Sequence, residues 1–191
     1  MTFREPQLAT TLAARKSIGA FYTRNDVTTV LCGWAIRAAT DKVLEPSFGG
    51  CGFLDASLET LAALGCEQPE ENVFGCDISD DAFIHLRERL PGTREGLRFA
   101  KADFLTLSSA ALGGREFDAV VGNPPYISHE KLSSTQRVSV RDWQNAQSFK
   151  LTGRPSLWVH FVLHSASFLR DGGRMAWVLP GRRSAWAACR V

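Results

Sequence analysis

The sequence has no long run of apolar residues. None of its apolar stretches approaches the roughly 20 residues with which a helix crosses a bilayer. The first residues also lack a basic stretch followed by an apolar run, which is the pattern of a secretory signal. We therefore expect a cytoplasmic protein that has no membrane partner.

Paired cysteines are missing as well. The five cysteines are odd in number and scattered, and none forms a Cys-x-x-Cys pair. This spacing favours neither a disulfide framework nor a zinc site. We predict reduced and mostly buried thiols at Cys32, Cys51, Cys66, Cys76 and Cys189.

Length and composition indicate one ordinary globular domain. The apolar fraction of 45% and the charged fraction of 22% are close to the averages of soluble proteins, which excludes disordered, fibrous and disulfide-scaffold classes. A chain of 191 residues is long enough for one doubly wound domain but too short for a second of similar size. We expect a single domain over residues 1–191.

Basic residues gather in the last third of the chain. Residues 1–130 contain 12 Lys and Arg against 18 Asp and Glu, whereas residues 131–191 contain 10 against 2. The second segment therefore has a net charge of +8, which favours a polyanionic substrate. A solvated basic face is an equally good interpretation, because charge alone does not identify a nucleic-acid site.

Strands and helices are predicted to alternate along most of the chain. The predicted strands are residues 42–45, 72–77, 97–102, 117–121 and 174–179. The predicted helices are residues 7–16, 25–36, 53–64, 79–90 and 156–169, with a polar excursion at 128–153 and a break at 171–173. This order predicts an α/β fold with a doubly wound, mostly parallel sheet, whose ligand site lies at the carboxyl ends of the strands.

The strongest functional signal is the tetrad Asn123-Pro124-Pro125-Tyr126, which follows the predicted strand at 117–121. Two prolines remove backbone donors and stiffen the chain, so nearby carbonyls are held ready to accept hydrogen bonds. Transfer of a group to an amino nitrogen conjugated with a base ring is slow because the nitrogen lone pair is delocalised. The Asn123 side-chain oxygen and the Pro124 carbonyl can accept from both N–H bonds and draw the nitrogen toward a tetrahedral form. Tyr126 would stack on a base removed from its helix, and a proline-stiffened turn is the alternative.

Further signals predict a ligand at the ends of the other strands. The glycine-rich turn at 45–54 allows a ligand close to the backbone, and it is neither a Gly-x-Gly-x-x-Gly fingerprint nor a P-loop. Asp77 ends the second predicted strand, where an acid suits ribose hydroxyls. Asp103 and Phe104 follow the third, where an acid can accept from an adenine amino group beside an aromatic ring. Helix caps or solvated acids are the alternative for both aspartates.

His160 and His164 have the four-residue spacing of a metal-binding pair on a helix. No Glu follows His160 as in His-Glu-x-x-His, and the neighbouring residues are apolar. We therefore predict a partly buried helix and no metal site.

These motifs, with Gly19-Ala20-Phe21-Tyr22-Thr23 before them, resemble in order the gamma-class N6-adenine DNA methyltransferases of restriction-modification and phage-defence systems. The resemblance covers about residues 17–180. It implies a Rossmann-like methyltransferase fold, S-adenosyl-L-methionine as the cofactor, and N6 of an adenine flipped from double-stranded DNA as the target, gripped by the tetrad. It implies cofactor contacts at Phe21, Tyr22, Thr23, Glu45, Pro46, Gly49, Gly52, Asp77, Ile78, Asp103 and Phe104.

The chain departs from the family pattern at three places. Arg24 stands where the family usually has Pro, and Cys51 where it usually has Gly. Beyond Pro180 the family continues into two further strands and a target-recognition region, whereas residues 181–191 read as an atypical tail. We expect a C-terminally truncated chain that lacks the last strands, with the edge of the fifth strand poorly covered. A separate target-recognition or specificity subunit is then a candidate partner.

Two other functions are consistent with the motifs. Protein glutamine N5-methyltransferases also use Asn-Pro-Pro-Tyr, but their usual Gly-x-Gly turn and helical N-terminal domain are not seen in this sequence. The other alternative is an inactive cofactor-binding fragment of a split or truncated methyltransferase.

Overall fold

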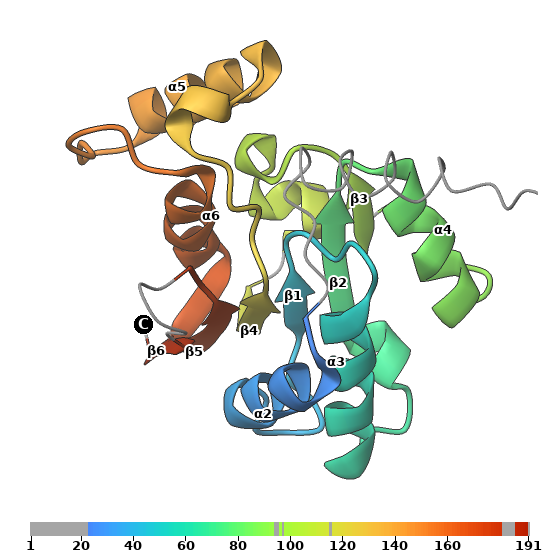
Figure 1. Cartoon of the computed structure of the whole chain (residues 1–191). Helices are drawn as coiled ribbons and strands as arrows, with labels where there is room; N and C mark the ends of the chain where they lie inside the picture. The colour runs from blue at the N-terminus through green and yellow to red at the C-terminus, as the bar shows by residue number, and fades with distance from the viewer. Residues whose placement is uncertain (1–22, 94–95, 97, 115, 181–185, 191) are drawn as a thin grey trace, which may run out of the picture.

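Short apolar runs form one mostly parallel sheet (Figure 1). The structure is a computed structural model, and it describes residues 23–93, 96, 98–114, 116–180 and 186–190. The strands are β1 (Val43–Glu45), β2 (Val73–Asp77), β3 (Phe99–Lys101), β4 (Phe117–Gly122), β5 (Leu169–Val178) and β6 (Trp186–Arg190). Their order is β3-β2-β1-β4-β5-β6, and the first five are parallel. The chain reverses its direction of winding between β1 and β4, where doubly wound folds bind their ligands. The predicted fold class is confirmed.

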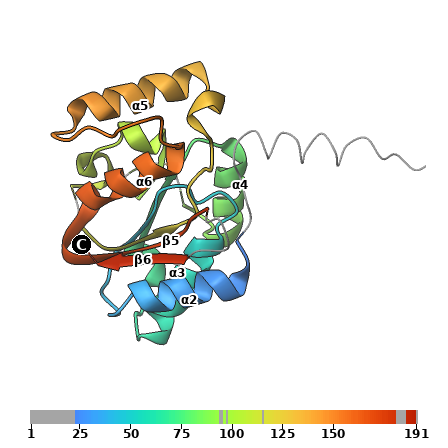
Figure 2. The same cartoon turned by 60° about the vertical axis from the view of Figure 1, so that its left-hand side comes forward.

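Helices cover both faces of the sheet. They are α2 (Asn25–Ala35), α3 (Gly52–Ala63), α4 (Asp80–Arg89), α5 (Ser134–Ala146) and α6 (Leu157–Ser165), with short 3-10 turns η1 (Pro69–Asn72), η2 (Phe104–Thr106), η3 (Ser109–Leu112), η4 (His129–Lys131) and η5 (Ala166–Phe168). Apolar residues of α2, α3 and α4 form one core cluster, and those of η2, α5 and α6 form the other. Figure 2 shows α2 and α3 on one side of the sheet and α5 and α6 on the opposite side.

The polar excursion contains a helix that we did not predict. Ser133 begins α5 with a capping box, in which its hydroxyl accepts from the Gln136 backbone and the Gln136 side chain accepts from the Ser133 backbone. Val140 and Trp143 lie on the buried side of this helix. Most residues of α5 are polar, so the segment has the composition of a surface loop although its few buried residues share one face.

The end of the chain differs from the expectation in two ways. The break at 171–173 lies inside β5 as an irregularity, because its pairing with β4 shifts between Phe117 and Ala119. Strand β5 thus begins at Leu169, and α6 is correspondingly shorter than predicted. The expectation that the edge of β5 is poorly covered is wrong, since β6 pairs antiparallel with it from Arg174 to Val178.

The structure tests the expectations for most of the cysteines, but not that for the first predicted helix. Cys32, Cys51 and Cys76 are free and buried, as predicted, whereas Cys66 is half-buried. The predicted helix at 7–16 lies outside the described residues. In the part of the chain that the structure covers, no helix has the length and apolar character needed to cross a membrane.

Candidate functional site

The junction of β1 and β4 brings two of the predicted motifs together. Ser47, in the turn after β1, donates from its hydroxyl to the Asn123 carbonyl at 3.3 Å. The Asn123 side-chain nitrogen donates to the Thr23 hydroxyl at 3.1 Å, across 100 residues of sequence. Thr23, the glycine-rich turn and the tetrad therefore form one site, whereas Phe21 and Tyr22 lie outside the described residues. Ser47 is a residue of this site that we did not predict.

Asp77 holds the glycine-rich turn against the end of β2. Its two carboxylate oxygens accept from the backbone N–H groups of Gly49 and Ser79, each at 2.9 Å. Burial raises the pKa of Asp77, and these hydrogen bonds oppose that rise. Ile78, the next residue, has a side chain that is 55% exposed. The Asp77 carboxylate, a hydrogen-bond acceptor, and the exposed apolar side chain of Ile78 are thus neighbours at this edge of the sheet.

The turn adopts a conformation that suits close approach of a ligand. Gly49 and Cys51 both have left-handed backbone angles, with φ of 44° and 66°, and α3 begins directly after them at Gly52. A side chain at such an angle is strained by roughly 1–2 kcal/mol. The left-handed angle therefore explains why a Gly would be the easier residue at position 51.

Glu45 is a buried acid beneath this turn. It is 2% exposed, and Oε2 has no hydrogen-bond partner within the described part of the chain. Burial and, secondly, the Asp77 carboxylate raise the pKa of Glu45 well above its usual range. Pro46, also buried, accepts from the Cys76 thiol through its carbonyl at 3.3 Å. A cationic ligand near this carboxyl would favour its ionised form.

The two residues after β3 have different surroundings. Asp103 is partly exposed, and its carboxylate accepts from the Leu105 backbone at 3.1 Å as the cap of η2. The Phe104 ring is only 1% exposed and packs on the rings of Phe161 and Phe168. The Phe104 ring therefore packs in the core, and a contact of this residue with the cofactor stays a prediction.

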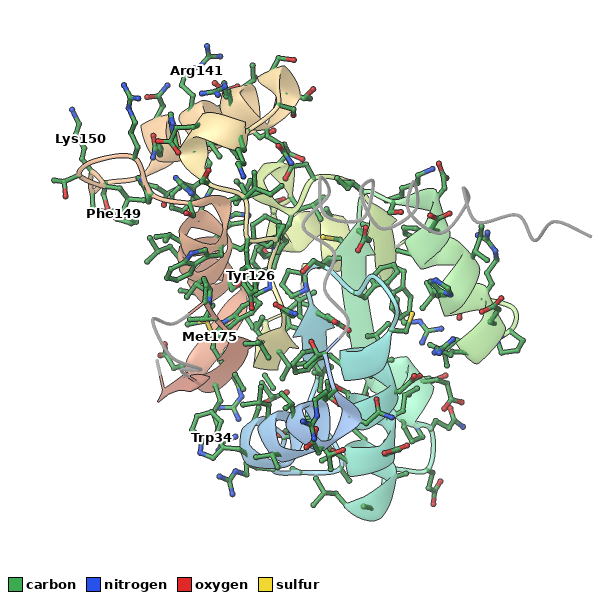
Figure 3. All side chains as sticks on the ribbon, viewed as in Figure 1. Trp34, Tyr126, Arg141, Phe149, Lys150 and Met175 are labelled. Atoms are coloured by element: carbon green, nitrogen blue, oxygen red, sulfur yellow. The ribbon has the colours of Figure 1, made fainter. Side chains whose placement is uncertain are left out.

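The end of β5 positions the last residue of the tetrad. The Tyr126 hydroxyl donates to the Val178 carbonyl at 2.6 Å, and burial raises the Tyr126 pKa to about 12. Figure 3 marks this half-buried side chain near the middle of the molecule, beside α6. Before the tetrad, a Cβ on Gly122 would lie 3.1 Å from the Trp177 ring, so this ring would have to shift slightly to admit a larger residue. Tyr126 is thus fixed at its hydroxyl end and is partly exposed.

The two histidines of α6 are engaged in hydrogen bonds to other elements. His164 Nδ1 accepts from the Trp143 indole at 2.9 Å, and its Nε2 lies 3.0 Å from the Leu107 carbonyl. His160 Nε2 lies 2.9 Å from the Gln144 side chain, and its Nδ1 lies 3.2 Å from the Ser156 carbonyl. Burial lowers the pKa of both. Both rings therefore favour the neutral form and tie α5 to α6.

The chain is similar to several known methyltransferases. The type II methyltransferase M.BstVI of Geobacillus stearothermophilus is 27% identical, over 74% of this chain and 28% of its own. A release factor glutamine methyltransferase of Chlorobaculum tepidum is 30% identical, over 61% of this chain and 40% of its own. The type I restriction-modification methyltransferase subunit of Streptococcus thermophilus has the same fold, with a TM-score of 0.63 at 24% identity over 84% of this chain and 34% of its own.

The chain thus spans less than half of the length of each of these proteins. A protein family, the Eco57I restriction-modification methylases, matches residues 79–187, which include Asp103 and the whole tetrad. Because this match covers more than half of the 191 residues, the chain belongs to the Eco57I restriction-modification methylase family.

Proposed function

We propose that this chain is the catalytic region of a DNA methyltransferase that transfers a methyl group from S-adenosyl-L-methionine to N6 of adenine, in a restriction-modification or phage-defence system. The observation that carries this proposal is the anchoring of Asn123 between Thr23 and Ser47. It sets the tetrad next to the turn that Asp77 holds. A target amine and a methyl donor can therefore meet between β1 and β4.

The residues at the ends of β1, β2 and β3 suit S-adenosyl-L-methionine. Asp77 would accept from the ribose hydroxyls, with Ile78 against the base, and Asp103 would accept from the adenine amino group of the cofactor. The unpartnered oxygen of Glu45 favours a cationic ligand, and this cofactor carries cationic groups. Pro46, Gly49, Gly52 and Thr23 would complete the site through their backbone and hydroxyl groups. When bound, the cofactor supplies an electrophilic methyl group on a sulfonium.

The tetrad would prepare the acceptor nitrogen. The bond from its amide nitrogen to Thr23 sets the orientation of the Asn123 amide, whose oxygen is the acceptor end. That oxygen and the Pro124 carbonyl would accept from the two N–H bonds of the target, which concentrates the lone pair on nitrogen. The Tyr126 ring would stack on the flipped base, held by its hydrogen bond to Val178.

The test is methylation of unmodified DNA by the chain, followed by analysis of the nucleosides. N6-methyladenine is the expected product, and Asn123→Ala should lower the single-turnover rate by about 100- to 1,000-fold. Gln68→Ala, at an exposed amide in the loop before η1, is the matched control and should leave the rate unchanged. Methylated cytosine as the sole product would contradict the proposed target.

The glutamine methyltransferase of Chlorobaculum tepidum makes a protein glutamine the second candidate target. The contact between Thr23 and Asn123 favours DNA, because Thr23 belongs to the segment before β1 that resembles the DNA enzymes. Tritiated methyl incorporation into DNA and into a release-factor-like protein, compared side by side, separates the two targets. Cofactor binding without transfer to either would indicate an inactive cofactor-binding fragment.

The DNA sequence would be read by another region or a separate specificity subunit. We propose that residues 1–191 act as one methyltransferase domain without target-recognition elements of its own. The full-length relative M.BstVI is more than three times as long as the segment that matches this chain. Base-by-base mapping of the methylated adenines tests this point, since a single short recognition sequence modified by the chain alone would contradict it.

A further inference from the structure

Residues 128–156, which we call the flap, follow almost directly after the tetrad in the sequence. The flap leaves the site two residues after Tyr126 and returns at Leu157, whose backbone N–H donates to the Ile127 carbonyl at 2.9 Å. That hydrogen bond closes the base of the flap. Figure 1 shows α5, the main element of the flap, beyond the carboxyl ends of the parallel strands, above α6. Any large substrate that delivers a base to Tyr126 must therefore pass close to the flap.

The inner side of the flap is fixed to the body of the protein. The Trp143 indole and the Gln144 amide bind the two histidines of α6, each at 2.9 Å. Leu132 and Val140 are buried in the same core cluster. The outer side is thus held in a defined position, as a preformed binding surface requires.

The outer side of the flap is basic. Exposed cations outnumber acids by five to two: Lys131, Arg137, Arg141, Lys150 and Arg154 against Glu130 and Asp142. Arg141 pairs with Asp142 at 3.0 Å, whereas neither Lys150 nor Arg154 forms an ion pair with any residue that the structure describes. Lys150 and Arg154 can therefore bind an external anion, with the Glu130 carboxylate within electrostatic range of Arg154.

An exposed aromatic ring lies among these charges. Phe149 is 44% exposed, and its ring meets the edge of Trp143 with centroids 6.2 Å apart. Figure 3 shows Arg141 on the side of α5 that faces away from the rest of the protein, and Phe149 and Lys150 on the loop that follows α5. Long cationic side chains around a flat ring suit the phosphates and bases of nucleic acid.

We propose that the flap is a DNA-contacting surface, on which Lys150 and Arg154 bind phosphates flanking the target base and Phe149 contacts a sugar or base. This inference rests on the proposed function, because it takes DNA as the substrate of the neighbouring tetrad. It assigns to the flap the positioning of the duplex, without reading of sequence, since phosphate contacts carry no sequence information. Five of the ten basic residues in the last third of the chain lie in this flap.

The test measures how DNA affinity depends on salt. A short duplex with one mismatched adenine is titrated with the chain at several salt concentrations. The double variant Lys150→Gln/Arg154→Gln should make the slope of log affinity against log salt shallower by about 2, because each lost phosphate contact changes it by about 0.9. The control variant Arg37→Gln/Arg87→Gln also removes two exposed positive charges, but from positions after α2 and on α4, and should leave the slope unchanged.

A second variant tests the aromatic contact. Phe149→Ala should lower the affinity about tenfold without changing the salt slope, because stacking releases no counterions. Leu163→Ala, an exposed apolar residue of α6, is its control.

The outcomes separate the inference from the proposed function. If the unchanged chain binds and methylates DNA but the flap variants behave like their controls, the inference is overturned and the flap serves another partner, such as a protein subunit. If the unchanged chain methylates a protein and no DNA, the proposed function fails, and the inference fails with it.

Discussion

At the scale of single residues, Asp77 links the proposed cofactor site to the fold of the turn. Asp77→Ala should weaken S-adenosyl-L-methionine binding by about 1–3 kcal/mol, because buried hydroxyls would lose their acceptor. The Gly49 backbone would lose its partner as well. Isothermal titration calorimetry measures the loss. Asp81→Ala in the first turn of α4 is the control, and equal affinities for both variants would contradict a ribose contact at Asp77.

The raised pKa of Glu45 leads us to expect that cofactor binding releases protons. Its raised pKa keeps the carboxyl protonated in the free protein over a pH range where an ordinary Glu is ionised. A cationic cofactor lowers that pKa, so affinity should rise with pH up to the pKa of the free protein and level off above it. Calorimetry in two buffers with different ionisation enthalpies gives the number of protons released.

The matched variants for this experiment are Glu45→Gln and Glu59→Gln. Glu45→Gln should abolish the proton release, whereas Glu59→Gln, at an exposed acid of α3, should preserve it. An unchanged release in Glu45→Gln would assign the proton to another group.

At the scale of elements, the attachment of α5 to α6 should depend on pH. Burial lowers the pKa of His160 and His164 below the usual value of about 6.5. Because their folded-state pKa lies below the unfolded one, their contribution to stability is complete above about pH 6.5 and is lost as the pH falls toward the folded-state value. A charged His164 also cannot accept from the Trp143 indole.

Amide hydrogen exchange in α5 is the suitable measurement. Protection of α5 should fall between pH 7.5 and about pH 5.5 by more than that of α3, after correction for the intrinsic pH dependence of exchange. A local readout is needed because the raised pKa values of Glu45 and Asp77 act on global stability in the opposite direction. Equal changes in both helices would show that the histidines do not control α5.

At the scale of the whole molecule, β6 covers an edge of the sheet. Five residue pairs join it to β5, from Arg174 with Arg190 to Val178 with Trp186. Removal of residues 181–191 would expose the N–H and C=O groups of the longest strand, which is a template for association. Light scattering should therefore show aggregation of the shortened protein. A chain that lacks only Val191 should scatter no more than the full chain, and a monodisperse 1–180 protein would contradict this role of β6.

Much of this architecture is predictable from local sequence. The strands at 43–45, 73–77 and 117–122 were predicted within one residue of their observed bounds, because short apolar runs between turn residues are local signals. The start of α5 also carries a local signal, the Ser-x-x-Gln pattern at 133–136, which we did not use. Strand β6 had no such signal, since its pairing depends on the unpaired edge that β5 presents.

The sequence by itself determined the fold class, the family and the tetrad at the end of β4, because alternating periods and strand-end motifs are properties of neighbouring residues. Only the tertiary structure decided which of these residues share a site. The bonds of Asn123 to Thr23 and of Ser47 to Asn123 cross 100 and 76 residues of sequence, so they depend on the placing of β1 beside β4. The same applies to Phe104, whose ring turns into the core because α6 and η5 present aromatic partners there. Strand order and packing set such contacts, and no local preference encodes them.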